Sequence, residues 1–395
     1  MSVTAVVLAG GPGTRLRPFT LHRPKPLMPV VNKPIIDYVL DLLELSGMVE
    51  RTYVLLDYMG ELLEDRLRRE RRAIEVVPIT FKALGTADAV RRIRHALSGD
   101  FLVLMGDIIT NLDVSALWNA HREKGAIATV ALKDVENPSH YGFALLSHDG
   151  RVCSFIEKPR SYELYVVSLA MRAAHAKHSY ANAVSVGVYA LSYKLLDVLD
   201  DNPYLLDFGR HVFPYLVEEG YPVYGWYAES CYWLDVGTPQ TYHQANADVL
   251  DGLSAPLRPP GINSSGVWME SVKELVGDVE PPSALGQGAS VRAGARLGPY
   301  SVVGRDVVVE EGARVVSSVL MEEAVVRKGA AVINSIVGSG AEIGEGARVV
   351  QSLVEDGAAV PLSVHLTGAL VLRERAQPRE ALERSGVGKA RAATA

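Results

Sequence analysis

Cysteine is nearly absent from this sequence, whose 395 residues include only Cys153 and Cys231. Two cysteines cannot build a disulfide framework or a cysteine-based metal site. The chain also lacks any apolar run near the ~20 residues that cross a membrane as a helix. No basic-then-apolar leader opens it. We therefore expect a cytoplasmic protein with no membrane partner.

The sequence also lacks an excess of positive charge. It has 40 lysine and arginine residues against 46 aspartate and glutamate residues, which gives a formal net charge of −6. A nucleic-acid-binding domain generally needs a basic face, so we expect no nucleic-acid partner. The one basic run, residues 66–72, is interspersed with and preceded by acidic residues, and we expect it to be the solvated face of a surface helix.

A glycine-rich loop ends the first apolar run, residues 3–9. The run is typical of a buried parallel strand, and the backbone N–H groups of such a loop can bind an anion. Four cations follow within eleven residues: Arg15, Arg17, Arg23 and Lys25. The loop lacks the Gly-Lys-Ser/Thr of a P-loop and the third glycine of the dinucleotide fingerprint. A different kind of triphosphate site is therefore predicted.

Alternating elements characterise the first 250 residues, a length that suits one domain of two, since single cores seldom exceed about 250–300 residues. We expect strands at 3–9, 53–56, 74–78, 101–105 and 127–132, and helices at 35–45, 60–71 and 87–97. This alternation is typical of a parallel α/β sheet. We predict an α/β domain with a Rossmann-like, mixed, mostly parallel sheet over residues 1–250.

A second domain is indicated by a repeat that follows a proline-rich stretch, residues 251–283, which we expect to be a linker. Aliphatic residues then recur every six positions from Leu285 to Val315. The pattern Gly-Ala, any residue, aliphatic residue also recurs, among others at Gly288, Gly294, Gly312, Gly329, Gly346 and Gly357. Hexapeptide repeats near three per coil are typical of a left-handed parallel β-helix. We predict this β-helix over 284–365 and a C-terminal tail over 366–395.

The opening motif carries a family resemblance. Gly10 to Thr20, followed by Pro24-Lys25-Pro26, resembles the signature of the sugar-1-phosphate nucleotidylyltransferases, Gly-Gly-x-Gly-Thr-Arg-Leu-x-Pro-x-Thr with a later Pro-Lys-Pro. The resemblance covers residues 1–250 and implies transfer of a nucleotide from an NTP to a sugar 1-phosphate, with release of pyrophosphate. It also implies Mg²⁺ as the cofactor. Such a reaction needs no covalent intermediate, so catalysis consists of positioning and charge neutralisation.

Two aspartates are candidate metal ligands. Asp107 follows the apolar run 101–105, and Asp235 lies in Trp-Leu-Asp-Val-Gly-Thr-Pro; both contexts match metal aspartates of the family. A lone aspartate after a strand can instead cap a helix, but Mg²⁺ prefers a few carboxylates beside substrate phosphates. The resemblance places Arg15 and Lys25 at the phosphates. The candidate catalytic residues are Arg15, Lys25 and Asp107, and the candidate metal ligands are Asp107 and Asp235.

The resemblance also implies two substrate surfaces. The expected nucleotide-binding residues are Leu8, Ala9, Gly10, Gly11, Gly13, Thr14, Gly85, Thr86 and Ala87. The expected sugar-phosphate-binding residues are Gly142, Glu157, Lys158 and Ser185. Taken generically, Gly-Thr-Ala is a helix start capped by Thr86, and Glu-Lys-Pro is a surface turn. Their order along the chain, between the phosphate loop and the Asp235 motif, favours the functional interpretation.

Two departures from the family pattern leave the substrates open. Residues 185–189 read Ser-Val-Gly-Val-Tyr where many relatives have Asn-Ala-Gly, with Asn182 three residues out of register, and no glutamate precedes Leu84-Gly85-Thr86. The first choice is GTP with mannose 1-phosphate, from the similarity of the opening motif and residues 106–113. Alternatives are a glucose-1-phosphate uridylyl-, thymidylyl- or adenylyltransferase, and a non-catalytic regulatory relative. The last would be expected to lose Arg15, Lys25 or a metal aspartate.

The β-helix raises the possibility of a second activity, because such coils often belong to acyltransferases. Enzymes that resemble this architecture use a catalytic histidine among the coils. Beyond residue 250 the sequence has only His365, after the last clear repeat. We therefore expect the β-helix to serve assembly of a homo-oligomer rather than acyl transfer.

Overall fold

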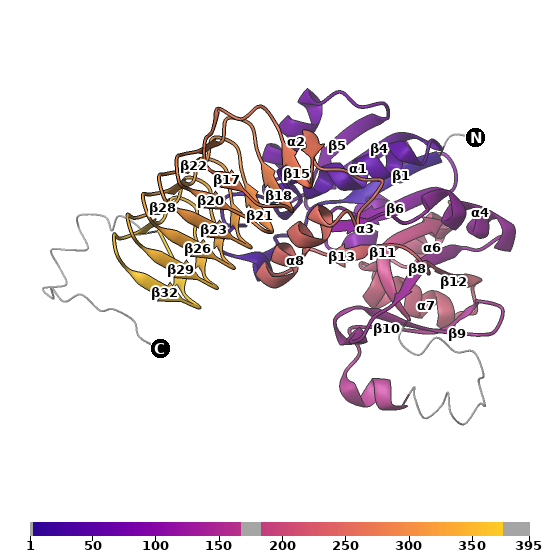
Figure 1. Cartoon of the computed structure of the whole chain (residues 1–395). Coiled ribbons are helices and arrows are strands. Elements are labelled where there is room, and N and C mark those ends of the chain that lie inside the picture. Colours follow the sequence, from indigo (N-terminus) through magenta and orange to yellow (C-terminus); the bar gives the residue numbers. More distant parts are fainter. Residues whose placement is uncertain (1–2, 167–182, 374–395) are drawn as a thin grey trace, which may run out of the picture.

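The first apolar run forms a central strand of a nine-stranded mixed sheet. The structure is a computed structural model that describes residues 3–166 and 183–373 (Figure 1), so Asn182 and residues 374–395 lie outside the described part. β1 (Val3–Leu8) pairs in parallel with β4 (Val49–Leu56) and β6 (Phe101–Met105), and β5 (Glu75–Thr80) pairs in parallel with β4. The predicted sheet type is confirmed. β1 is buried on both faces, as its continuous apolar sequence requires.

Antiparallel strands complete the other half of the sheet. β11 (Ala183–Leu191) pairs antiparallel with β6, β8 (Ala128–Asp134) and β9 (Gly142–Leu146). β10 (Val152–Glu157) forms a hairpin with β9, and β12 (Val223–Tyr227) runs parallel to β8. A separate antiparallel pair joins β7 (Ile108–Thr110) to β13 (Trp233–Asp235). This pair brings two distant segments of the chain to the same place.

Helices cover both faces of the sheet. They are α1 (Ile35–Leu45), α2 (Gly60–Arg69), α3 (Thr86–Arg92), α4 (Val114–Lys124), α6 (Leu195–Asp201), α7 (Phe213–Glu218) and α8 (Pro239–Leu250). Ala5 and Val7 face the apolar layer that contains α1, whereas Val6 faces the layer that contains α3, α6 and α7. The helix expected at 87–97 ends at Arg92, and a 3-10 turn (Arg94–Ala96) continues it. No helix in the described part of the chain is long and apolar enough to cross a membrane.

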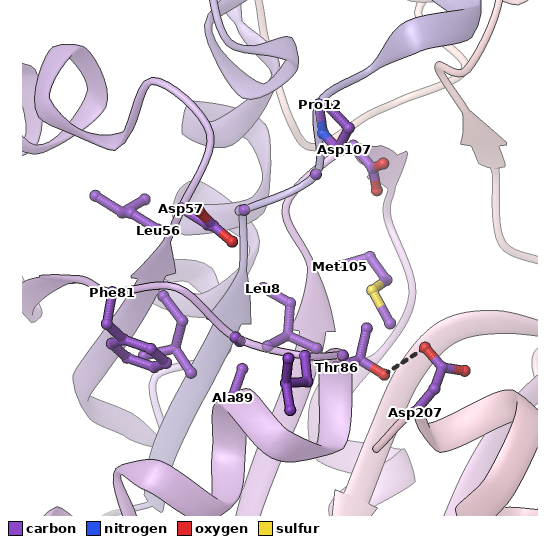
Figure 2. Close-up of a pocket in the computed structure, with 16 residues that line it drawn as sticks. Leu8, Pro12, Leu56, Asp57, Phe81, Thr86, Ala89, Met105, Asp107 and Asp207 are labelled. Carbon is purple, nitrogen blue, oxygen red and sulfur yellow. Dashed lines mark hydrogen bonds between the residues drawn. The ribbon is translucent and has the colours of Figure 1, made fainter.

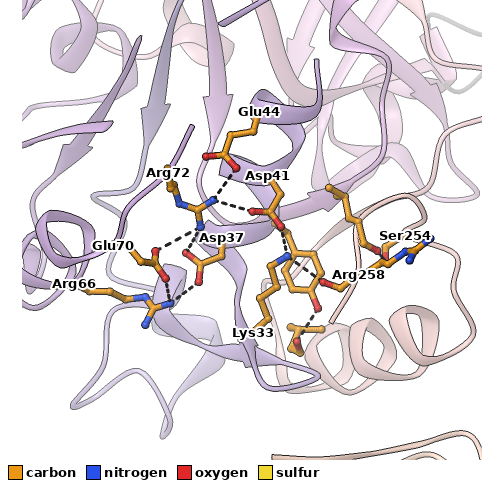
Figure 3. A network of polar contacts seen from close by, with 12 residues as sticks. Lys33, Asp37, Asp41, Glu44, Arg66, Glu70, Arg72, Ser254 and Arg258 are labelled. Carbon is orange, nitrogen blue, oxygen red and sulfur yellow. Dashed lines mark hydrogen bonds and ion pairs between the residues drawn. The ribbon is translucent and has the colours of Figure 1, made fainter. Parts of the chain in front are cut away.

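The basic run at 66–72 is only partly a solvated face. Arg68 and Arg69 pair with Glu64 and Asp65 one turn earlier, as expected. Arg66 and Arg72 instead reach the buried carboxylate of Asp37 on α1, at 2.6 and 3.0 Å (Figure 3). These ion pairs connect α1 to α2 and to the chain after it.

Three parallel ladders form the second domain (Figure 1). The first contains β15 (Val267–Met269), β18 (Ser283–Leu285), β21 (Ser301–Val303), β24 (Val319–Leu320), β27 (Ile336–Val337), β30 (Leu353–Val354) and β33 (Leu370–Val371), with β14 (Ile262–Ser264) antiparallel at its edge. The second contains β16 (Glu274–Leu275), β19 (Ser290–Val291), β22 (Val308–Val309), β25 (Val325–Val326), β28 (Glu342–Ile343) and β31 (Ala359–Val360). The third contains β17 (Asp278–Val279), β20 (Arg296–Leu297), β23 (Arg314–Val316), β26 (Ala331–Ile333), β29 (Arg348–Val350) and β32 (His365–Thr367).

Each coil contributes one strand to each ladder, which is the architecture of a parallel β-helix. The ladders begin before residue 284, because β15, β16 and β17 lie in the proline-rich stretch, and they continue past residue 365 to β33. The prolines Pro281 and Pro282 lie between strands, where their missing N–H groups remove no ladder hydrogen bond.

The 17-residue repeat has a specific structural cause. Ser318, Ser335 and Ser352 are buried at equivalent corners, and each hydroxyl accepts a hydrogen bond from the backbone N–H 17 residues later, at 3.0–3.1 Å. The residue before each serine has a positive φ, between 46° and 48°. The serine therefore satisfies a corner N–H that a sharp turn leaves outside the ladder.

The β-helix packs directly on the α/β domain. Val302, Val319 and Met321 belong to the same apolar cluster as Met28 and Val30. Asn32 donates to the Val303 carbonyl at 3.0 Å, and His243 on α8 lies 2.6 Å from the Ser317 carbonyl. The segment that carries the Arg-Pro-Lys-Pro motif is therefore held between the two domains.

Candidate active site

Four parallel strands end at one edge of the sheet, and the loops that follow them surround a pocket of about 420 Å³ (Figure 2). This is the edge at which open α/β sheets bind ligands. The lining residues come from the ends of β1, β4, β5 and β6 and from the 206–208 region: Leu8, Gly10, Gly11, Pro12, Leu55, Leu56, Asp57, Phe81, Ala83, Leu84, Gly85, Thr86, Ala89, Met105, Asp107 and Asp207.

Several expected nucleotide-binding residues line this pocket. They are Leu8, Gly10, Gly11, Gly85 and Thr86. Ala9 and Ala87 are instead buried behind the wall. Gly13 has φ +58° and precedes the 3-10 turn that carries Thr14 and Arg15, so it directs the chain from the glycine loop toward the cations.

The start of α3 is built differently from the generic expectation. Gly85, not Thr86, occupies the N-cap position. The hydroxyl of Thr86 donates to Asp207 Oδ2 at 3.0 Å and accepts from the Phe208 N–H at 2.9 Å. The free N–H groups of Ala87 and Asp88 bond to the Leu206 carbonyl, which approaches Gly85 too closely to leave room for a side chain. Thr86 thus joins α3 to the far wall of the pocket.

Lys25 lies between the two candidate metal aspartates. Its Nζ is 2.6 Å from Asp107 Oδ2 and 3.0 Å from Asp235 Oδ1, and its side chain is 7% exposed. The β7–β13 pair creates this arrangement, because Asp235 is opposite Ile108 and the Val236 N–H donates to the Asp107 carbonyl at 3.2 Å. Burial lowers the pKa of Lys25, but the two carboxylates outweigh it and raise the pKa above its ordinary value. Lys25 is therefore a fixed positive charge.

The two aspartates have the donor chemistry for Mg²⁺. Their carboxylates come from separate segments yet converge at Lys25, whose Nζ bonds to one oxygen of each. No group of three or more His, Cys, Asp or Glu side chains that could hold a metal occurs among residues 3–166 and 183–373. Mg²⁺ is typically held by one or two carboxylates together with substrate phosphates and water. The residues present fit that pattern.

Arg15 lies beside Asp235 at the open side of the site. Its Nη2 is 3.5 Å from Asp235 Oδ2, and its side chain is 59% exposed, so it remains accessible to a ligand. A Cβ at Gly237 would lie 2.9 Å from Arg15 Nη2 and 3.1 Å from Asp235 Oδ2. Thr238 and Pro239 then start α8 with a capping box. The Asp-Val-Gly-Thr-Pro sequence therefore positions a carboxylate, leaves space for a guanidinium and begins a helix.

The expected sugar-phosphate residues form a second group. Glu157 lies opposite Gly142 in the β9–β10 hairpin, and a Cβ at Gly142 would be 2.8 Å from Glu157 Oε2. Burial raises the pKa of the Glu157 carboxyl above its ordinary value. Lys158 has φ +51° and a half-exposed side chain, with Nζ 3.7 Å from Glu157 Oε1. Ser185 lies on β11, where its hydroxyl is 3.4 Å from the Tyr189 hydroxyl.

Sequence reasoning missed several side chains in the pocket, among them Asp57, Phe81, Met105 and Asp207. Asp57 directly follows β4, as Asp107 closely follows β6, so the rule that identified Asp107 could have found it. Asp207 accepts the Arg210 N–H at 3.0 Å as a helix cap, and nothing in its local sequence points to the pocket.

Comparisons with known proteins show which family this chain resembles. The family described as "Nucleotidyl transferase" matches residues 4–252, and the one described as "GMPPB C-terminal domain" matches residues 279–384. A UTP–glucose-1-phosphate uridylyltransferase from Synechocystis is 28% identical over 80% of this chain and 82% of its own. Mannose-1-phosphate guanylyltransferase 1 from Arabidopsis thaliana is 29% identical over 80% and 81%. A glucose-1-phosphate adenylyltransferase from Clostridium novyi is 32% identical over 62% and 66%.

Proposed function

This chain belongs to the nucleotidyl transferase family, as a sugar-1-phosphate nucleotidylyltransferase, and we propose that it joins GTP and mannose 1-phosphate to give GDP-mannose and pyrophosphate. The observation that carries the choice of substrates is the match of the second domain, residues 279–384, to the GMPPB C-terminal domain. The Arabidopsis guanylyltransferase, similar across both domains, supports it.

In the proposed reaction, an oxygen of the sugar 1-phosphate attacks the α-phosphorus of the NTP. The bond from that phosphorus to the bridging oxygen breaks, and pyrophosphate leaves with the electron pair. Arg15, exposed beside Asp235, is placed to bind the β- and γ-phosphates and to stabilise the charge that accumulates on pyrophosphate. The glycine loop, Gly10 to Gly13, brings backbone N–H groups to the same phosphates.

Asp107 and Asp235 would hold Mg²⁺, which when bound supplies positive charge to the triphosphate. Lys25 orients both carboxylates by bonding to each of them. Because its pKa is raised, Lys25 keeps its proton in the working pH range and adds a permanent charge beside the phosphates. The four charged groups therefore form one connected cluster: Lys25 contacts Asp107 and Asp235, and Asp235 also contacts Arg15.

At the sugar, Lys158 would bind the 1-phosphate, and Glu157 would accept hydrogen bonds from hydroxyl groups. Glu157 is confined by Gly142 and Gly209, since a Cβ at either glycine would meet its carboxylate. Gly142 is itself buried, and the lack of a side chain there leaves room for the Phe155 ring and the Glu157 carboxylate. The ionised form of Glu157 is the one that accepts two hydroxyl hydrogen bonds.

A second substrate pair has specific support. The Synechocystis uridylyltransferase and the Clostridium adenylyltransferase are both named for glucose 1-phosphate. A matrix of GTP, UTP, dTTP and ATP against mannose and glucose 1-phosphates, with pyrophosphate release as the readout, separates the candidates. The highest kcat/KM with GTP and mannose 1-phosphate is expected. A higher value for any glucose 1-phosphate pair would overturn the proposal.

We also propose a homo-oligomer assembled partly through the β-helix. The support for this is the set of three parallel ladders, since the unpaired backbone groups of edge strands favour pairing between chains. Light scattering on the full chain tests this. A mass of one chain at all concentrations would exclude it.

A further inference from the structure

Asp57 is a carboxylate in the nucleotide pocket with no assigned role. It follows the last residue of β4, and its side chain lines the pocket at the end away from Asp207, with Leu8 between them (Figure 2). Within the part of the chain that the structure describes, its carboxylate has no hydrogen-bond or ion-pair partner. The carboxylate is therefore available to a ligand.

The backbone fixes Asp57 against the phosphate loop. The Tyr58 N–H donates to the Gly10 carbonyl at 3.3 Å, and the Gly60 N–H donates to the Asp57 carbonyl at 3.1 Å. A Cβ at Gly10 would lie 2.9 Å from Asp57 Cβ, so the two segments are in direct contact. A nucleotide whose phosphates lie on the glycine loop therefore has Asp57 close to its nucleoside.

The other two carboxylates of the pocket are already engaged. Asp107 bonds to Lys25, and Asp207 bonds to Thr86 and to the Arg210 N–H. The remaining lining side chains are apolar, apart from Thr86, and include no Lys, Arg, His, Asn or Gln. Asp57 is thus the one free polar side chain on the described pocket wall, and it only accepts hydrogen bonds when ionised.

An acceptor-only group discriminates among bases. Guanine presents two adjacent donors, N1–H and the N2 amino group, which match the two oxygens of a carboxylate. Adenine and cytosine each present one donor beside a ring-nitrogen acceptor, and uracil presents one N–H between two carbonyl oxygens. Asp57 is exposed in the ligand-free structure, and a bound base would cover its carboxylate. The carboxylate would then be repelled by those acceptors and would leave a hydrogen bond unmade, which is costly once water is displaced.

We propose that Asp57 selects the base by accepting hydrogen bonds from N1–H and the N2 amino group of guanine. This inference rests on the proposed use of GTP and names the residue that accounts for it. The absent glutamate before Leu84-Gly85-Thr86 is consistent with it, because the base is then read from the β4 side of the pocket instead.

The experiment compares GTP, inosine triphosphate and xanthosine triphosphate as substrates of wild type and Asp57→Asn. Inosine lacks the 2-amino group, and xanthosine carries an oxygen there. Wild type is expected to favour GTP over both analogues by roughly ten- to a hundredfold in kcat/KM. In Asp57→Asn the side-chain amide donates to the xanthine oxygen while its carbonyl accepts N1–H, so the preference between GTP and xanthosine triphosphate reverses.

Two further variants serve as controls. Asp57→Ala should lose the preference for GTP over inosine triphosphate. Its kcat/KM for xanthosine triphosphate should not rise. Asp207→Asn should lower kcat/KM for all three nucleotides by a similar factor, because it disturbs the Thr86 contact rather than the base. Thermal unfolding of each variant verifies that it is folded.

The outcomes separate this inference from the proposed function. If wild type uses GTP but Asp57→Asn keeps the wild-type ratios, the assignment of Asp57 is overturned; a uniform loss with unchanged ratios would assign it to the ribose. If wild type prefers UTP or ATP, the proposed substrates fail before any variant is tested. Direct titration of wild type with GTP and inosine triphosphate adds a check that needs no variant, and equal affinities would exclude a contact to the 2-amino group.

Discussion

Arg23 joins the segment that carries Lys25 to the β-helix through Glu322. Its Nη2 lies 2.8 Å from Glu322 Oε1 and 2.7 Å from Ser339 Oγ, and its side chain is 16% exposed. Lys25 is only two residues further along the chain and holds both candidate metal aspartates. The second domain therefore supports the position of a charged group in the proposed site.

Arg23→Ala should lower kcat by severalfold and the free energy of unfolding by about 1 kcal/mol, because Glu322 is partly exposed and solvent screens the pair. Arg305→Ala is the matched control, since Arg305 bonds to the other oxygen of Glu322 at 3.1 Å but does not adjoin Lys25. Steady-state kinetics and chemical unfolding measure the two effects. Equal kcat values for the two variants would contradict a positioning role for Arg23.

Activity should require a divalent cation, and Asp107→Asn or Asp235→Asn should each lower kcat about a hundredfold or more. Each change removes a carboxylate from the metal position and a partner from Lys25. Pyrophosphate release with and without EDTA is the measurement. Asp134→Asn, an exposed aspartate at the end of β8, is the control. Full activity in EDTA, or an active double variant, would exclude the metal assignment.

Arg15→Ala and Lys158→Ala should affect different kinetic constants. Arg15 is assigned to charge that develops on pyrophosphate, so its loss should lower kcat more than it changes the KM for the sugar phosphate. Lys158 is assigned to the bound sugar 1-phosphate, so its loss should mainly raise that KM. Initial-rate kinetics with each substrate varied distinguish the two, and the opposite pattern would exchange their roles.

Much of this site is predictable from local sequence, and the rest depends on tertiary pairing. Asp107 can be located because an apolar run and a following loop define a strand end. The convergence of Lys25, Asp107 and Asp235 cannot, because it depends on the register between β7 and β13, more than a hundred residues apart in sequence. The partner of Arg23, in a separate domain, is equally invisible to local patterns.

The fold shows the same division. Hexapeptide periodicity predicts the β-helix, since each repeat places an aliphatic residue inside. The proline-rich stretch at 251–283 has no such regularity, yet β15, β16 and β17 lie in it because the first complete coil offers them a ladder to join. Tertiary pairing there outweighs weak local preference.

Ser335→Ala should lower the free energy of unfolding by about 1–3 kcal/mol. The change removes the acceptor for the Ser352 N–H at a corner of the coil where both serines are buried, so a donor is left without its partner. Ser363→Ala, at an exposed corner, should have little effect. Chemical denaturation of the two variants gives the comparison, and similar stabilities would show that the serine corner contributes nothing.

Glu157→Gln should gain stability relative to wild type as the pH rises. Burial raises the pKa of Glu157 above its ordinary value of 4.5, so the folded protein holds this proton more tightly than the unfolded chain. The stability that the group contributes is complete below the ordinary value and is lost as the pH rises through the raised one. Unfolding at a series of pH values measures this difference, and a difference independent of pH would contradict the burial effect.

The contacts of Arg23 and Lys25 also set an order of events during protein synthesis. Lys25 meets Asp235 across 210 residues, and Arg23 meets Ser339 across 316. A growing chain therefore carries Arg23 and Lys25 long before the groups that position them have left the ribosome. The cluster of Lys25, Asp107 and Asp235 can close only after Asp235 has emerged, so a product terminated before that residue would lack the complete charged site.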